Sequence, residues 1–170
     1  MDESGVYYWA WLLQAGSFTA GQECEAALTL HDTFSRNAED AVVVRLSPGT
    51  HTIAVRCGED RVAQAFPFRP GESYLVVAKL VTGKGRLPEQ LFVRVFLPDE
   101  PVEAIEPLHW TLTTKGTAID GRLDTVTLEV RSVVPLKLDE FRLADRWRVA
   151  ALPWIQPTEA PPEFTAGILR

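Results

Sequence analysis

The chain has 170 residues, a length that suits one domain with a sizeable core. Hydrophobic residues make up 46% of it and charged residues 24%, which is ordinary for a globular protein. The net charge of −6 argues against nucleic acid as a partner, because phosphates call for a basic surface, and it argues equally against an anionic membrane surface. The longest apolar run, residues 6–13, falls well short of the roughly 18 to 20 residues of a membrane-spanning helix, so we expect no membrane insertion.

The first residues, MDESG, are acidic and lack the basic start of a signal peptide. We therefore expect no signal peptide in this chain. Two interpretations stay open: a cytoplasmic protein, or a domain taken from a longer secreted protein.

Alternation with a period of two dominates the sequence. Val126, Leu128 and Val130 alternate with polar residues, and residues 24–30 and 51–57 follow the same pattern. Such a pattern predicts strands with one face on a core. Residues 6–13 and 74–81 are almost continuously apolar, which is typical of central strands that are covered on both faces.

Glycine- and proline-containing turns separate these runs, and no segment keeps an apolar stripe at helical spacing for three turns. The sequence predicts ten strands, near residues 6–14, 22–31, 41–46, 50–57, 61–66, 72–82, 89–97, 108–114, 123–131 and 137–143. Many short strands with such turns indicate an all-β antiparallel sandwich or barrel with little helix. We expect one domain over residues 1–152 and a proline-rich tail or linker over residues 153–170.

The segment LDEFRLADRW, residues 138–147, predicts the last strand and a turn after it. On a strand, Phe141 and Leu143 share one face, which we expect to face the core. Glu140 and Arg142 share the opposite face and should be exposed or paired. Trp147 should then cover the open end of the core, so its predicted role is structural.

Cys24 and Cys57 both lie on the apolar phase of their strands, so both should point inward. If the two strands are neighbours, the thiols could form a disulfide in an oxidising compartment. The alternative is two small buried residues without a bond, and two thiols alone do not make a metal site.

Four segments in order resemble the LamG-like, concanavalin A-like jelly-roll domains of bacterial surface and secreted proteins. They are GVYYWAWLLQ (5–14), PGESYLVVAKL (70–80), EQLFVRVFLPDEP (89–101) and LDEFRLADRW (138–147). Residues 144–146 depart from the family's pattern, where a pair such as Gly-Thr would be expected.

The resemblance implies a concanavalin A-like jelly roll, a lectin-like role and an extracellular or cell-surface location. It also allows calcium, held by loop aspartates such as Asp99 or Asp120, as the one cofactor; we otherwise expect none.

Catalysis finds little support in the sequence. A glycosidase needs two carboxylates about 5 to 9 Å apart, and Glu23 and Glu25 are the only pair at alternating strand positions. Their neighbours belong to the core face, so this pair should be solvated. Glu100, Glu103 and Glu106 lie among prolines in a loop, and there is no G-x-S-x-G elbow or zinc-binding spacing. We expect no enzyme, no catalytic residue and no metal ligand.

A sugar site would use exposed aromatic rings, and the chain has five tryptophans. Four of them lie where packing is the better explanation: Trp9, Trp11, Trp110 and Trp147. Trp154, which follows the last strand, is the one candidate for ligand binding.

Three functions remain open. The first is a noncatalytic lectin-like binding or adhesion module of a larger protein, with a glycan or a surface protein as partner. The second is a structural spacer without a ligand, and the third is a glycoside hydrolase of the same fold. The oligomeric state stays open.

Overall fold

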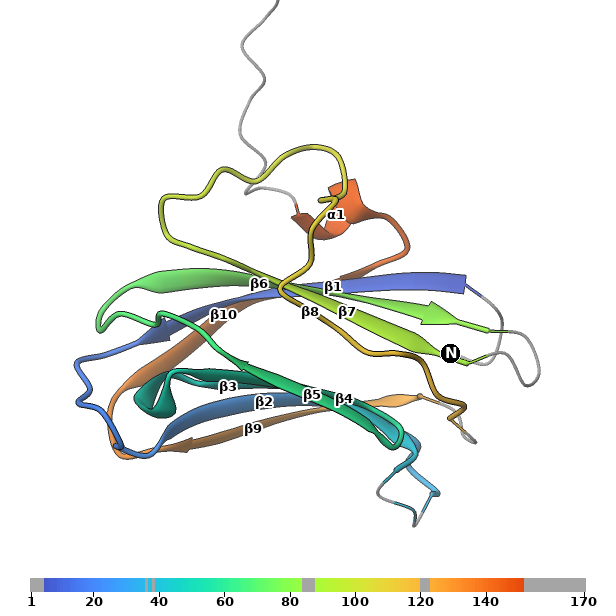
Figure 1. The fold of residues 1–170 in the computed structure, drawn as a ribbon, viewed down its shortest axis with the longest axis horizontal. Coiled ribbons are helices and arrows are strands. Elements are labelled where there is room, and N and C mark those ends of the chain that lie inside the picture. Colours follow the sequence, from blue (N-terminus) through green and yellow to red (C-terminus); the bar gives the residue numbers. More distant parts are fainter. Residues whose placement is uncertain (1–4, 36, 38, 84–87, 120–122, 152–170) are drawn as a thin grey trace, which may run out of the picture.

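The computed structural model describes residues 5–35, 37, 39–83, 88–119 and 123–151 as two stacked antiparallel sheets (Figure 1). Sheet A has the strand order β10 (Leu136–Ala144), β1 (Gly5–Ala15), β6 (Ser73–Thr82), β7 (Gln90–Phe96) and β8 (Leu112–Thr113). Sheet B has the order β5 (Asp60–Ala65), β4 (Thr52–Cys57), β3 (Ala41–Ser47), β2 (Cys24–His31) and β9 (Thr125–Ser132). Helical structure is confined to the short η1 (Pro48–Thr50) and α1 (Trp147–Ala151) within the described residues. The predicted fold class, an all-β antiparallel sandwich with about ten strands and little helix, is confirmed.

The strand bounds follow the predicted ones closely, with one exception. The strand expected over residues 108–114 is only Leu112–Thr113, because residues 97–111 form a long connection over the outside of sheet A. In sheet B, β2 to β5 are consecutive hairpins. The β4–β5 turn requires a glycine: Gly58 has a φ of 59°, and a Cβ there would come within 2.5 Å of Thr117 Cγ2.

The main core lies between the sheets. Its largest fully buried members include Trp9, Leu13, Leu46, Ile53 and Leu80. These residues alternate with outward-facing ones along their strands, as the period of two predicts.

Both cysteines belong to this core, so their inward placement is confirmed. They are free thiols, because β3 lies between β2 and β4 and the two cysteine strands are not neighbours. The condition for the predicted disulfide is therefore not met.

A second apolar cluster covers the outer face of sheet A. Tyr8, Val77 and Phe96 project from the sheet, and Trp147 of α1 packs on them. The Trp147 indole Nε1 donates a hydrogen bond to the carbonyl oxygen of Glu103 at 3.0 Å. Strands β1 and β6 are therefore buried on both faces, which confirms the interpretation of their continuous apolar runs.

The predicted position of Trp147 is wrong in one respect. Its side chain is buried, but it lies on the outside of sheet A and does not close the end of the inter-sheet core. The physical reason is that α1 turns back over sheet A, where the wide apolar face of β1 and β6 is available.

The expected burial of Phe141 and Leu143 is also wrong. Leu143 lies opposite Trp9, so it faces the inter-sheet side, yet it is 52% exposed and Phe141 is 48% exposed. Strand β10 is the last strand of sheet A, and no described strand covers its flank. A bulge adds to this opening, because the pairing with β1 shifts near Glu140, whose φ is 56°.

Candidate functional site

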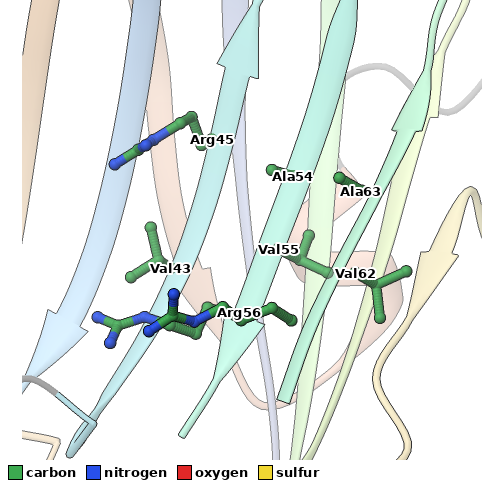
Figure 2. A pocket seen from close by; sticks show the side chains of 8 residues that line it. Val43, Arg45, Ala54, Val55, Arg56, Val62 and Ala63 are labelled. Atoms are coloured by element: carbon green, nitrogen blue, oxygen red, sulfur yellow. The ribbon is translucent and has the colours of Figure 1, made fainter. Parts of the chain in front are cut away.

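A hollow of about 460 Å³ lies on the outer face of sheet B, over β3, β4 and β5 (Figure 2). Its polar lining consists of three arginines: Arg45, Arg56 and Arg61. Its remaining lining consists of the aliphatic residues Val43, Ala54, Val55, Val62 and Ala63.

The register of the three strands forms the floor of the hollow. Ala54 on β4 pairs directly with Ala63 on β5 and, on its other side, with Arg45 on β3. Directly opposite residues point to the same face, so two methyl groups lie side by side between longer side chains. Figure 2 shows Ala54 and Ala63 next to each other and the chains of Arg45 and Arg56 extending away from them. Short residues at the centre of the face therefore create the depression.

The next row of the same face carries the densest charge. Arg56 on β4 lies directly opposite Arg61 on β5, and Val43 on β3 lies on its other side. Burial lowers the pKa of Arg56 below its ordinary value, the charges of Arg61 and Arg45 lower it further, and Glu39 acts in the opposite direction. Arg56 thus has the like charge of Arg61 on one side and the carboxylate of Glu39 acting on it from another, and it also borders a hollow that Asp32 and Asp40 line.

Arg45 is positioned from the neighbouring strand. Its Nε lies 3.3 Å from Glu25 Oε1, and Ser47 Oγ donates to Glu25 Oε2 at 3.1 Å. Arg45 remains 47% exposed in its side chain, and the other N–H groups of its planar fork lie beyond this contact. Glu25 therefore orients the Arg45 side chain, which forms one side of the hollow.

The chemistry of the hollow is that of hydrogen-bond donation. Its lining residues include no carboxylate, histidine, cysteine or hydroxyl group that could act as a base or nucleophile. They also include no aromatic ring on which a sugar could stack. The arrangement can bind a ligand that offers acceptor oxygens, and it has no evident means to cleave one.

Of the residues that the sequence suggested, Glu100, Glu103 and Trp147 line one hollow of about 370 Å³ on the outside of sheet A, where Glu100 is ion-paired with Arg94. Two other suggested carboxylates lie apart from it. Glu25 is engaged by Arg45 and Ser47, and Glu106 accepts hydrogen bonds from Tyr8 and Lys79 on the outside of sheet A. These carboxylates hold structure together rather than flank a groove.

The four described tryptophans do not supply a sugar platform either. Trp9, Trp11 and Trp147 are buried, and Trp110 packs against Trp147. Trp154, the predicted ligand-binding candidate, lies outside the described residues, as does the predicted tail 153–170.

The suggested calcium ligands remain untested. Asp99 is exposed in the loop after β7, and Asp120 lies outside the described residues. Across the described part of the chain, no group of three metal-binding side chains comes together. Within the same residues, no helix is long and apolar enough to cross a membrane.

A second hollow, of about 380 Å³, lies where the free edges of β9 and β10 part. Trp11, Leu28, Leu128, Leu138 and Phe141 give it apolar walls. It opens into the core, and its walls are mainly apolar, whereas the polar lining of the first hollow consists of arginines.

Sequence reasoning missed all three arginines of the first hollow. In the alternating patterns, each of them counted only as a polar residue on the outward face of a strand. A signal existed: the outward positions of three consecutive strands read Val43-Arg45, Ala54-Arg56 and Arg61-Ala63. The hairpin register is needed to see that the small residues fall together and that the arginines surround them.

Comparisons with known proteins add little to this geometry. No family model matches the sequence, and no curated protein matches it. Among solved structures, sheep galectin-11 in complex with glycerol aligns with 85% of this chain and 93% of its own, at 9% identity and a TM-score of 0.46. A likeness at this identity and TM-score carries no information about the function of this chain. No LamG-like relative is found, and what the structure itself supports is an antiparallel β-sandwich of two five-stranded sheets.

Proposed function

We propose that this chain is a noncatalytic carbohydrate-binding module whose ligand occupies the hollow over β3, β4 and β5. The observation that carries the proposal is the arginine-lined depression on the outer face of sheet B, a face that no described helix or strand covers. Carbohydrates present many acceptor oxygens on a flat outline, and guanidinium forks donate several hydrogen bonds in one plane. The LamG-like resemblance, and the extracellular or cell-surface location that it implies, belong to the same proposal.

A glycan array with a blocking variant tests the proposal. Ala54→Phe should fill the floor of the hollow and remove binding, while its melting temperature stays near that of the parent, because Ala54 faces outward. The matched control is Thr127→Phe, which adds the same ring to the exposed strand β9 of the same sheet, outside the hollow. Binding that survives Ala54→Phe would place the site elsewhere. No binding to any glycan would leave the spacer without a ligand as the better description.

A further inference from the structure

We infer that the free edge of β9 (Thr125–Ser132) binds the same edge of a second copy of this chain, so that two sheets B join into one continuous sheet. This contact does not depend on the proposed function. It follows from how the four strands at the ends of the two sheets differ, and from the order of charges on β9.

Three of the four end strands carry a feature that discourages pairing with another chain. β8 has only two residues, and β10 contains the bulge near Glu140. β5 turns polar side chains toward the core, because Asp60 and Gln64 lie directly opposite core residues of β4. These three edges are therefore poor templates for a further strand.

Strand β9 has none of these features. It pairs with β2 through eight consecutive residues, and its sequence, TVTLEVRS, contains no glycine or proline. The inward side chains of Val126, Leu128 and Val130 are 45%, 51% and 47% exposed. A long, regular edge with an apolar row of this kind is a template for another strand.

The backbone of β9 offers hydrogen bonds on the same side. The Val133 N–H donates to the carbonyl oxygen of Glu23 at 3.0 Å, so the odd-numbered residues of β9 bond toward β2. The N–H and C=O groups of Leu128, Val130 and Ser132 then point away from β2, where no described strand pairs with them. A second chain can continue this ladder.

The charges on the outward face of β9 select the partner and the register. Glu129 and Arg131 are exposed and are already ion-paired within their strand, and Arg131 also lies opposite Glu25 of β2. In an antiparallel pair of two β9 strands centred on Val130, Glu129 of each copy lies opposite Arg131 of the other. The four charges then alternate in sign around a square, so the contact requires no uncompensated charge in the monomer.

A shift of the centre by one residue removes this match. A pair centred on Glu129 places two glutamates opposite each other, and a pair centred on Arg131 does the same with two arginines, which is destabilising. In the register centred on Val130, the two copies of this half-exposed valine lie opposite each other and both lose contact with water. Because each copy uses the same edge, the contact closes at two copies.

The dimer has a consequence for the arginine-lined hollow. The two-fold axis of such a strand pair is perpendicular to the joined sheet, so the outer faces of both sheets B point the same way. Each face carries one hollow over β3, β4 and β5, separated from β9 by β2. The dimer therefore presents two hollows on one side.

Sedimentation velocity over a range of concentrations tests the inference. We expect a monomer with an open edge in dilute solution and a dimer with a Kd of roughly 10 to 100 µM, because a contact made by one strand is small. Glu129→Arg and Arg131→Glu should each weaken the homodimer roughly ten- to a hundredfold, since both opposed pairs become like charges. An equimolar mixture of these two variants should restore a dimer, because opposite charges again face each other.

The control Arg148→Glu makes the same charge change as Arg131→Glu, but at an exposed position of α1 outside the contact. It should dimerise like the parent. Thermal unfolding at dilute concentration should give all variants melting temperatures close to that of the parent, which shows that the single variants fold.

Three outcomes would overturn the inference. A parent that stays monomeric at about 1 mM would reject the dimer, and the edge would then be open or covered by another segment of the same chain. A dimer that persists in both single variants, or a mixture that fails to restore it, would place the contact at another surface or register. Particles larger than a dimer would contradict a contact that closes at two copies.

Discussion

Strands β3 and β9 of sheet B carry the same pattern of alternating residues but bury their inward side chains to different depths. On β3, the inward residues Val42, Val44 and Leu46 are completely buried. On β9, Val126 and Leu128 occupy the same phase, and Leu128 pairs directly with the buried Leu28, yet they are 45% and 51% exposed. Alternation therefore sets the side that a residue faces, whereas the place of its strand in the sheet sets how deeply it is buried.

The largest expected effect compares two aromatic residues of the same C-terminal segment. Trp147→Ala should lower the free energy of unfolding by about 3 to 5 kcal/mol, because the indole is buried and hydrogen-bonded to Glu103. Phe141→Ala should cost about 1 kcal/mol or less, since half of the ring is already in water. Urea unfolding followed by fluorescence measures both. Equal losses of unfolding free energy in the two variants would mean that the edge formed by β9 and β10 is covered in solution.

A matched pair of leucines sharpens the comparison inside the main core. Leu46→Ala should lower the free energy of unfolding by about 2 to 5 kcal/mol, because it leaves a cavity in close-packed surroundings. Leu128→Ala should cost roughly 1 kcal/mol or less. Thermal and urea unfolding of the two variants should give the same ranking. A ranking in the reverse order would contradict the assignment of β9 as an open edge.

Thiol chemistry tests the same difference without removing any core side chain. Burial raises the pKa of the Cys57 thiol from 9.0 to about 12, so at neutral pH its thiolate is roughly a thousandfold rarer than for an ordinary cysteine. Cys24 is buried as well. Neither should react with a thiol reagent until the chain unfolds, whereas Leu128→Cys should add one thiol that reacts in the native state. Fast modification of the parent protein would contradict the burial of Cys24 and Cys57.

The raised pKa also gives a pH dependence. The native state holds the Cys57 proton to a higher pH than the unfolded state does, so this contribution to stability is complete below about pH 9 and is lost as the pH rises toward 12. Cys57→Ala should flatten the alkaline part of a plot of unfolding free energy against pH. An unchanged slope would show that other groups cause it.

The smallest expected effect concerns the arginine pair. Arg61→Gln should raise the free energy of unfolding by about 0.2 to 1 kcal/mol, since it removes a like charge directly opposite Arg56. The control is Arg131→Gln, where the arginine is ion-paired with Glu129 in its own strand and should give no gain. Chemical denaturation at low salt resolves the two. A loss of stability in Arg61→Gln would mean that the pair is not repulsive.

The sequence predicted the positions of the strands better than it predicted how deeply each strand is buried and which strands are neighbours. The runs around Trp9 and Val76 predicted central strands, because residues that are apolar on both phases need cover on both faces. Phe141 was misplaced because its pattern is that of a core strand, and the sequence does not show that β10 stands at an edge. The site was missed for a related reason: Arg45, Arg56 and Arg61 become neighbours only through hairpin register.

The position of α1 has a practical consequence for how the protein is handled. Ala151, the last described residue, is buried on the outside of sheet A, whereas the arginine-lined hollow lies on the outer face of sheet B. Figure 1 shows α1 and sheet B on opposite sides of sheet A. A molecule immobilised on a sensor surface through α1 would be held by the covered side and would present the hollow to the solution. Coupling through surface carboxylates near Glu25 would instead obstruct the hollow, so the choice of attachment point decides whether a binding measurement can succeed.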